Sequence, residues 1–580
     1  MKIVKTLYVS SLLLLLSKVL HCADSYNVGD PVPFFVNKIG PLHNPSETYQ
    51  YYELPFCHPG RVLEKKESFG ELLNGDRMAN ALYKLEFAVN KTGENLCHKK
   101  LSKDDVAKFR DAIKKDYYFQ MYYDELPLWA FIGKVEDDNT GPKYFLFTHV
   151  NFYALYNGNH VIEIHALSDP NRAVDVTEDA ALEVEFSYSV FWSETSTPYM
   201  NRMARYSRAS LHPVLQKIHW YSFANSIITV ILLTGLLTML FTRHLKNDLR
   251  KWSIGDEEED EVGRKYNSVH ALVCPKNIPL FSAVMGCGTQ LLTLVILLFF
   301  LALLGAIYPY SHGLISTYTF TSYILTSAIA GYTSASFCSQ HAETGWKWSA
   351  VLSGMLFIVP FTVAAFFLNT LATYFGVTSA LPLGTIFLIL LIYFFVALPL
   401  LVFGGVIGHR HKSDLHVPPV AKKYAKEVPS LAWYRKTPAQ MFIGGLLPFS
   451  VVVMQLHNLC STIWGYKVYT SPGILFGTFT ALVATTALLS ICLTYFQLAG
   501  DNHDWWWRSI LSGGSTGIFM FAYCIYFYLK SSDMRGALQA SFFLVYSGCL
   551  CYAFFLMLGT VSFQASLLFV RRLCRAGKNE

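Results

Sequence analysis

Charged residues are scarce in this chain of 580 residues. Asp, Glu, Lys and Arg together make up 15% of the sequence, whereas hydrophobic residues make up 52%. Soluble globular proteins carry roughly 25% charged residues, so this balance excludes an ordinary soluble domain and indicates a protein of the lipid bilayer. The net charge of +6 is small for the length. Its positive part lies beside hydrophobic segments, which indicates membrane orientation rather than nucleic-acid binding.

Acidic and basic residues are absent from the centres of the long apolar runs. Proton- and ion-coupled transporters usually need such residues at membrane depth, so their absence counts against a pump. A carrier of a neutral molecule remains open, and the polar residues that would serve it are Gln290, Gln455, His457 and Asn458. The simpler interpretation of these four is hydrogen bonding between helices.

The sequence also lacks the usual signs of a metal, cofactor or catalytic site. The twelve cysteines include no CxxC pair. His409, His411 and His416 have no acidic or cysteine partner at ligand spacing, so a basic stretch beside the membrane explains them better. His503 and Asp504 lack a nucleophile and an enclosed pocket. We therefore expect no catalytic, cofactor-binding or metal-binding residues.

Residues 1–23 have the pattern of a signal peptide. Lys2 and Lys5 form a basic n-region, a leucine-rich stretch follows, and small residues near position 22 offer a cleavage site. The apolar stretch is too short to span a bilayer, which takes about 20 apolar residues. An uncleaved anchor is the alternative. With a cleaved signal, residues 24–220 would enter the secretory lumen.

Residues 24–220 contain no spanning run and show the alternation of β-strands. From Leu182 to Trp192 every second side chain is apolar, which is the period of a half-buried strand. Asn157-Gly158 lies between two alternating segments and can form the tight turn of a hairpin. We predict a β-rich lumenal domain.

Three local features of this domain can be read from the sequence. Ser102 and Asp105 stand in capping-box spacing and predict the start of a helix. Asn90 begins the one glycosylation sequon of the region. Cys57 and Cys97 are the two cysteines of the domain, and an isolated pair in an oxidising compartment is a candidate disulfide.

The chain changes character after residue 220. Nine apolar runs follow, each long enough to cross roughly 30 Å of hydrocarbon as a helix. They lie near 221–242, 281–307, 315–337, 347–369, 381–408, 441–463, 472–496, 508–529 and 540–568. We predict a polytopic α-helical membrane protein with nine transmembrane helices over 221–570. The run 381–408 contains Pro382 and Pro399, so we expect a kink or a tilt there.

Lys and Arg set the orientation of the runs. They gather after the first, the fifth and the ninth run, and the connections on the other side hold almost none. The positive-inside rule then places the tail, residues 571–580, in the cytosol and the N-terminal domain in the lumen. An odd number of spans gives the same answer independently of charge.

The segment YFQLAGDNHDWWWRSILSGGSTG, residues 495–517, begins at the predicted turn between the seventh and eighth runs. Tryptophan concentrates at membrane interfaces, and arginine there can bond a phosphate or a carbonyl. We therefore predict that Trp505, Trp506, Trp507 and Arg508 anchor the eighth helix at the interface. A binding edge for a partner or a lipid is the alternative.

Glycines within the runs predict close helix packing. Gly513 and Gly517 have GxxxG spacing, and Gly404 and Gly408 repeat it. Gly444 and Gly445 are further small positions. Such residues let helices approach closely, either within the protein or against the helix of another membrane protein.

Five motifs give the chain a resemblance to a known family. They are GPLHNPSETYQYYELPFC (40–57), NGDRM (74–78), LPFS (447–450), LTYFQLAGDNHDWWWRSILSGGSTG (493–517) and FFLMLGTVSF (554–563). The chain resembles the nonaspanins, the transmembrane nine superfamily, and within it the member-one type. The resemblance covers essentially the whole chain.

The resemblance implies a function in membrane traffic. Nonaspanins belong to Golgi and endosomal membranes, assist the delivery of other membrane proteins, including clients with glycine-rich helices, and have no catalytic activity. Members commonly end in a K-x-D/E signal read by the COPI coat, and Lys578 and Glu580 match it. Such a signal is a receptor-read address. We therefore predict an endomembrane sorting factor whose partners are lipids, client proteins and COPI. The alternative is a transporter or channel for a small neutral or lipid-like solute.

Overall fold

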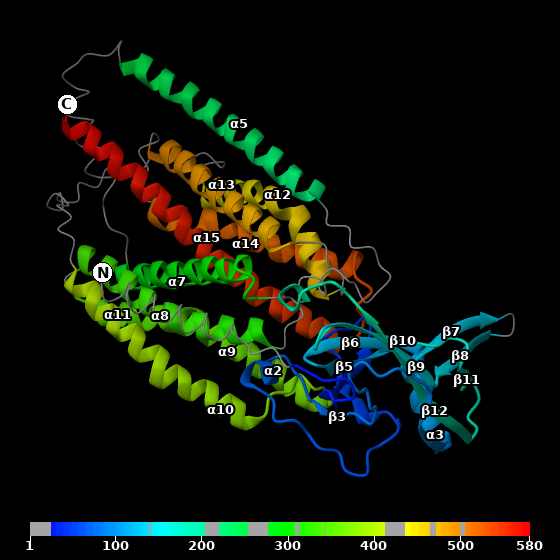
Figure 1. Cartoon of the computed structure of the whole chain (residues 1–580). Helices are drawn as coiled ribbons and strands as arrows, with labels where there is room; N and C mark the ends of the chain where they lie inside the picture. Colours follow the sequence, from blue (N-terminus) through cyan, green and yellow to red (C-terminus); the bar gives the residue numbers. More distant parts are fainter. Residues whose placement is uncertain are drawn as a thin grey trace.

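The computed structural model describes residues 25–138, 141–202, 220–252, 277–307, 313–342, 344–411, 436–464, 471–498 and 505–579. Figure 1 shows two parts, a β-rich domain and a bundle of long helices that meets the domain at one end. The predicted combination of a β-rich N-terminal domain with membrane helices is confirmed.

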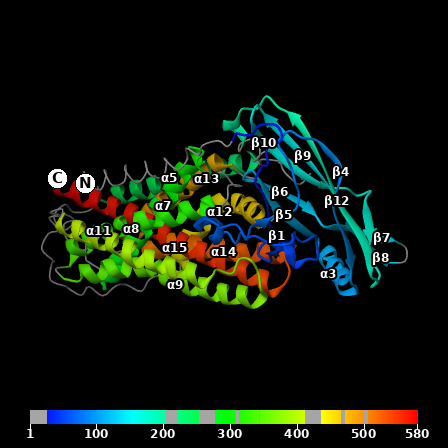
Figure 2. The same ribbon diagram turned by 60° about the horizontal axis from the view of Figure 1, so that its bottom comes forward.

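Twelve strands are described in the β-rich domain. They are β1 Phe34–Pro41, β2 Tyr49–Gln50, β3 Ala79–Asn80, β4 Lys91–Leu101, β5 Tyr117–Tyr123, β6 Leu126–Phe131, β7 Gly133–Asp138, β8 Gly141–Phe147, β9 His149–Asn157, β10 His160–Ser168, β11 Ala173–Asp175 and β12 Leu182–Glu194. One sheet has the order β2-β1-β5-β6 with β3 beside β1, the second is β10-β9-β12-β4, and the third is β11-β8-β7. In Figure 2 the first sheet lies toward the bundle and the second faces away from it.

The hydrophobic core of the domain lies between the first two sheets. Val184, Val190 and Trp192 of β12 are buried, as the period of two predicted. Their side chains join a cluster that includes Phe109 and Phe152. This core follows from the alternation, because a strand points every second side chain to the same face.

Two predictions of local structure are confirmed. Helix α3, Lys103–Lys114, follows Ser102, whose side chain forms a capping box with Asp105. Strands β9 and β10 pair as an antiparallel hairpin. The pairing of Asn157 with His160 makes Gly158 the first residue of the turn, and Gly158 has the positive φ of 57° that such a turn requires.

The bundle is built from long helices. They are α5 Trp220–Trp252, α7 Ile278–Leu303, α8 Leu314–His341, α9 Trp346–Phe375, α10 Leu383–Ile392, α11 Leu398–Arg410, α12 Thr437–Trp464, α13 Pro472–Leu498, α14 Trp505–Lys530 and α15 Ala537–Asn579. A π-helical turn, Tyr393–Ala397, joins α10 to α11. A π-helical turn holds one extra residue, and the expected kink or tilt of this run stays a prediction.

Eight helices of the described residues are long and apolar enough to cross a membrane. Helix α8 has the length but is less apolar, because serine and threonine occur along it. It nevertheless packs in the bundle against α7, α9 and α11. A hydroxyl inside a helix can bond its own backbone, as Thr326 does to the Ser322 carbonyl at 2.8 Å, so these residues do not prevent burial.

Candidate functional site

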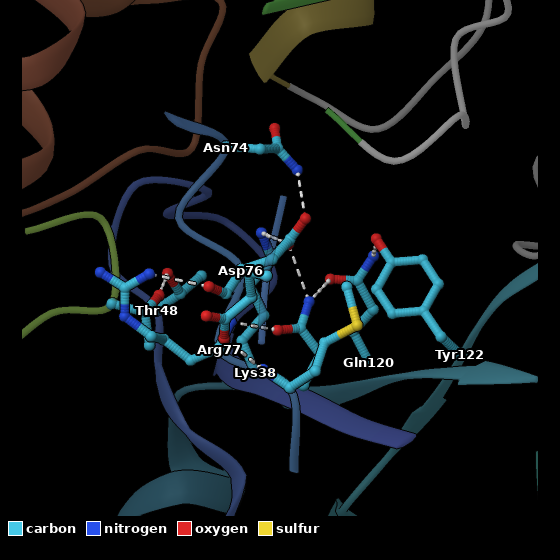
Figure 3. A network of polar contacts seen from close by, with 11 residues as sticks. Lys38, Thr48, Asn74, Asp76, Arg77, Gln120 and Tyr122 are labelled. Carbon is cyan, nitrogen blue, oxygen red and sulfur yellow. Dashed lines mark hydrogen bonds and ion pairs between the residues drawn. The ribbon is translucent and has the colours of Figure 1, made fainter. Parts of the chain in front are cut away.

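A buried carboxylate organises the motif NGDRM at the base of the β-rich domain. The side chain of Asp76 is fully buried. Its Oδ1 accepts hydrogen bonds from Asn37 Nδ2 at 2.8 Å and Lys38 Nζ at 3.2 Å, and its Oδ2 accepts one from Asn74 Nδ2 at 3.0 Å (Figure 3). A carboxylate with its acceptor sites occupied in this way fixes structure rather than offering a base.

Residues of the domain also form hydrogen bonds with the connection between α9 and α10. Arg77 donates from Nη2 to the Ala380 carbonyl at 2.8 Å. Thr48 and Thr378 bond through their hydroxyls at 2.7 Å, and the Thr378 N–H donates to the Thr48 carbonyl at 2.8 Å. Gly75 has a φ of +73°, and a Cβ there would lie 3.0 Å from the Ser379 Cα. The turn thus needs glycine for both conformation and space.

Two more connections between bundle helices contact the β-rich domain. Asn44 Nδ2 donates to the Arg535 carbonyl at 2.7 Å, and Arg535 N–H donates back to Asn44 Oδ1 at 2.9 Å. Gly70 and Gly313, before α8, approach so closely that a Cβ on Gly313 would lie 2.1 Å from the Gly70 carbonyl carbon. The domain thus contacts three connections of the bundle: the one before α8, the one between α9 and α10, and the one between α14 and α15. We call these three contacts together the joint. The motifs 40–57 and 74–78 both serve it.

The joint was missed in the analysis of the sequence. The signal was present, since polar residues with short side chains flank Gly75 and Pro45. Their partners lie about 300 to 490 positions away in the chain. No local pattern identifies such partners, so only the fold brings the pairs together.

The four glycines predicted to pack helices lie against other helices of the bundle. A Cβ on Gly404 would be 1.9 Å from the Ala328 carbonyl oxygen of α8. One on Gly513 would be 2.3 Å from the Ser562 Cβ of α15. Gly408 and Gly517 approach the backbone of the same two helices, α8 and α15 respectively. These glycines are therefore used within the protein.

Gly235 of α5 differs from these glycines. A Cβ there would meet no atom within 4 Å. It lies on an open surface patch whose lining residues all come from α5: Val230, Ile231, Thr234, Gly235, Thr238, Met239 and Thr242. Of the residues in the most apolar stretch of α5, 6% are buried, against 56% in α14. Figure 1 shows α5 along one side of the bundle, where it packs mainly against α12 and α13 among the described helices.

Two of the three tryptophans predicted to be interface anchors are enclosed by other helices. Trp505 is fully buried and Trp506 is 3% exposed, so the structure places both rings inside the bundle rather than on its lipid-facing surface. Phe563 of α15 stacks on Trp505 with 5.5 Å between ring centroids. Trp507 and Arg508 are partly exposed. His503 and Asp504 lie outside the described residues.

Three of the four polar residues considered for a neutral carrier bond across helices. Gln290 Nε2 donates to the Tyr323 carbonyl at 3.1 Å, and Asn458 Nδ2 donates to Ser222 Oγ at 2.8 Å. His457 Nδ1 and the Tyr523 hydroxyl are 3.0 Å apart. Gln455 is the exception, because within the described chain neither its Nε2 nor its Oε1 has a hydrogen-bond partner.

The remaining predicted residues fall in three groups. Cys57 and Cys97 form a disulfide. Asn90 is exposed, and its Oδ1 accepts a hydrogen bond from the Trp192 N–H at 2.6 Å. Lys578 belongs to α15, and its side chain, like Glu580, His416 and residues 1–23, lies outside what the structure describes.

A metal site is not found among the described residues, where no group of three or more His, Cys, Asp or Glu side chains is placed to hold an ion. His409 instead stacks on Trp346 at 4.6 Å and bonds Ser339 Oγ through Nδ1 at 2.8 Å. His411 ends the described part of this segment. The absence of a catalytic site stays a prediction.

Comparison with known proteins places this architecture in a family. A β-rich domain joined to a bundle of apolar helices defines a multi-pass membrane protein. A family model described as "Endomembrane protein 70" matches residues 48–537. The chain is 52% identical over 565 residues to transmembrane 9 superfamily member 5 of Arabidopsis thaliana, with 96% of each chain covered. It is 39% identical over 562 residues to member 1 of Mus musculus, covering 94% of this chain and 93% of the mouse protein.

The chain therefore belongs to the endomembrane protein 70 family, the transmembrane 9 superfamily or nonaspanins. The resemblance read from the five motifs is confirmed. No solved structure matches the chain.

Proposed function

We propose that this protein is a sorting factor of Golgi and endosomal membranes that holds the transmembrane helix of a client protein against α5. The family places it among endomembrane proteins. The observation that carries the proposal is the open face of α5 around Gly235. The proposal includes no catalytic step.

The position of Gly235 supports a helix as the occupant. Gly384 and Gly473 are also open, but each is the second residue of its helix, whereas Gly235 lies in the middle of an apolar stretch. The Thr238 and Thr242 hydroxyls each bond a carbonyl one turn back, at 2.7 and 2.9 Å. The threonine hydroxyls of this face are therefore already hydrogen-bonded, and Gly235 leaves room in it for the backbone of another helix to approach. A glycine-rich client helix is the complementary surface.

We also propose nine spans, with α8 as the ninth, a lumenal β-rich domain and a cytosolic tail. Support comes from the contacts at the ends of α8. Gly313, before its first turn, meets the domain, and His341, in its last turn, lies beside Trp506 at 5.5 Å. Helix α8 therefore runs the length of the bundle, and the positive-inside rule then orients all nine helices.

The test uses a reporter client with a glycine-rich transmembrane helix. A photo-crosslinking residue at Thr238 should capture this reporter, and Gly235→Leu should lower both the crosslink and the delivery of the reporter to the cell surface about tenfold. The matched control is Gly384→Leu, because it also fills an open glycine on a helix surface. Unchanged capture by Gly235→Leu, or an equal loss in both variants, would contradict the proposal.

The tail is tested separately. Lys578→Ala together with Glu580→Ala should shift the protein from Golgi membranes toward later compartments, because the coat would lose its signal. The control carries Asn579→Ala, which leaves both signal residues in place. An unchanged distribution of the double variant in fluorescence microscopy would remove COPI retrieval from the proposal.

A neutral-solute carrier is the second candidate function, and Gln455 is the observation that favours it. An amide buried in a bundle without a partner is unusual and can bond a polar ligand. Uptake of a neutral solute into liposomes by the purified protein, lost in Gln455→Leu, would support a carrier. Equal leakage with and without the protein would reject it.

A further inference from the structure

Three rings lie in a row across the second sheet of the β-rich domain. Phe191 of β12 and Tyr153 of β9 are opposite each other in the sheet, and their rings stack with 5.3 Å between centroids. Tyr153 is in turn opposite His165 of β10. Tyr153 is 42% exposed, and the other two residues are partly exposed. The sheet therefore presents a continuous surface of rings that is three strands wide.

The row is on the face of the sheet that points away from the hydrophobic core. Val190 and Trp192, on either side of Phe191, are buried in the core, and so is Phe152 before Tyr153. Because side chains alternate along a strand, the rings of the row point to the opposite face. This sheet faces away from the bundle in Figure 2, so the described helices do not cover it. A contiguous exposed surface of rings indicates a site of contact with another group.

The glycosylation sequon of the domain begins at the end of the same row. Strand β4 pairs with β12, and the last pair of this ladder joins Lys91 to Val190. One step further along the antiparallel ladder Asn90 comes opposite Phe191, so both side chains are on the same face. Asn90 is exposed, and its Oδ1 accepts a hydrogen bond from the Trp192 N–H at 2.6 Å. This bond holds the amide beside β12 through its oxygen, whereas a sugar is attached at its nitrogen, Nδ2.

The spacing and the chemistry of the row suit a chain of sugars that starts at Asn90. Neighbouring strands are about 4.8 Å apart, which is close to the length of one sugar unit, so successive sugars meet successive rings. The faces of a sugar ring carry C–H groups, and these are attracted to the negative face of an aromatic ring. Asn151, two residues before Tyr153 on the same face, is partly exposed and supplies an amide for sugar hydroxyls. The row therefore offers a sugar both apolar and polar contacts.

We propose that Asn90 carries an N-linked glycan and that the first two sugars of this glycan pack on Phe191 and Tyr153. Attachment joins Nδ2 to the anomeric carbon of an oligosaccharide linked to a lipid diphosphate, with loss of one proton from Nδ2 and departure of the lipid diphosphate. A glycan of this chain is the occupant because its point of attachment is one strand away from the rings. Tethering gives the glycan a high local concentration, so weak contacts suffice to hold it. The proposal rests on the proposed lumenal placement of the domain, since glycans are attached in the lumen.

Cleavage by endoglycosidase H tests the packing, because this enzyme cuts between the first and second sugars. The full-length protein is made in cells that leave its glycans in the high-mannose form, and the rate of cleavage is measured on the folded protein. Phe191→Ser together with Tyr153→Ser should raise this rate about tenfold, since the sugars lose both rings. Tyr153→Phe, which keeps the ring, is the matched control and should leave the rate within about twofold. Equal rates in the wild-type protein and the double serine variant would overturn the proposal.

A relocated glycan separates this proposal from the lumenal placement on which it rests. Thr92→Ala together with Ala173→Thr removes the sequon at Asn90 and creates one at Asn171, an exposed residue outside the row. The glycan on Asn171 should be cleaved about tenfold faster than the glycan on Asn90, because no ring of the row shields it. A glycan on Asn171 in this variant but none on Asn90 in the wild-type protein would overturn the proposal and leave the domain lumenal. Absence of both glycans would contradict the lumenal placement as well.

A second measurement serves if the serine variants fold poorly. Thr92→Ala alone removes the glycan and keeps the bond between Asn90 and the Trp192 N–H. Labelling of Tyr153 by hydroxyl radicals should then rise about threefold, because a packed sugar shields the ring. Tyr144 of β8, in the third sheet, is the control and should be labelled equally in both proteins. Unchanged labelling of Tyr153 would overturn the proposal.

Discussion

The β-rich domain and the helix bundle satisfy their polar groups by different means. Every ion pair described in the structure lies in the domain, and two of them, Lys38–Asp76 and Arg202–Asp124, are buried or nearly so. In the bundle, hydroxyls donate to carbonyls of neighbouring helices instead. These bonds include Ser226 to Val451, Ser327 to Ala397, Ser515 to Met441 and Ser562 to Ser509.

The difference follows from the surroundings of each part. A charge buried in the domain is stabilised by polar and charged partners from several strands and turns, as Asp76 is, whereas a charge inside a lipid-covered bundle costs more and finds fewer such partners. Neutral donors and glycine contacts then have to determine which helices meet. We therefore expect the domain to respond to changes of charge and pH, and the bundle to respond to changes of volume.

The largest loss of stability should come from adding a side-chain atom where two helices of the bundle touch. In Gly404→Ala the new Cβ would lie 1.9 Å from a backbone oxygen of α8, so α8 and α11 have to separate. We expect a loss of at least about 3 kcal/mol and little folded protein in fluorescence-detected size-exclusion chromatography. Gly235→Ala, with open space around it, is the control. A normal folded yield of Gly404→Ala would break the comparison.

The next largest loss of stability should come from removing a buried charge in the β-rich domain. Asp76→Ala leaves the buried Asn37 and the largely buried Lys38 without their shared acceptor, so we expect a loss of about 3 kcal/mol. Hydrogen exchange should rise in β1 and β5 of the domain, while α14 and α15 stay protected. Asp138→Ala, which breaks an exposed pair with Lys143, should cost far less, because ion pairs at the surface are screened by water. An equal effect of the two changes would argue against a special role for Asp76.

A smaller effect should come from a single hydroxyl in the bundle. Ser562 Oγ donates to the Ser509 carbonyl at 2.6 Å and lies 2.7 Å from Ser490 Oγ, within hydrogen-bond distance. Ser562→Ala should cost about 0.6 kcal/mol, since bonds between membrane helices are worth little more. Thermal unfolding in detergent measures this loss, and Ser541→Ala, whose hydroxyl bonds only within α15, is the control. A loss above about 3 kcal/mol would show that hydroxyls in this bundle matter as much as ion pairs do in the domain.

The smallest effect should be a pH dependence that belongs to the domain. Burial and the nearby charge of Arg172 lower the pKa of His149. The folded domain then binds fewer protons than the unfolded chain, so its stability falls as pH drops below about 6.5, the ordinary pKa of histidine. His149→Gln should reduce this dependence of stability on pH. Thermal melts at several pH values measure the stability of the protein, and hydrogen exchange of β9 reports the local effect. His58, whose pKa is also lowered, accounts for a residual slope of the same sign. A steeper slope in the variant would reverse the assignment.

The sequence predicts elements better than it predicts contacts between them. The strand from Leu182, the cap at Ser102 and the long apolar runs were readable because each is a local periodic pattern. The glycine spacings likewise indicated close packing. Their partners were not readable, because the sequence does not say whether Gly404 meets a client or α8.

The tryptophan segment shows the other limit. Three adjacent tryptophans resemble an interface belt by composition, but Phe281, Phe337 and Phe563 supply a ring environment that buries Trp506. These phenylalanines come from three helices and are spread over more than 280 positions of the chain. The joint was unreadable for the same reason, since the partner of Asn44 is Arg535.

The joint has a consequence for what the protein can accept. Because three separate connections of the bundle hold the domain, its sheets keep one orientation relative to the helices. If a client helix packs against α5 as proposed, the water-soluble part of that client has to fit beside the β-rich domain, which cannot move aside. Selection would then act on the bulk outside the bilayer as well as on the helix within it.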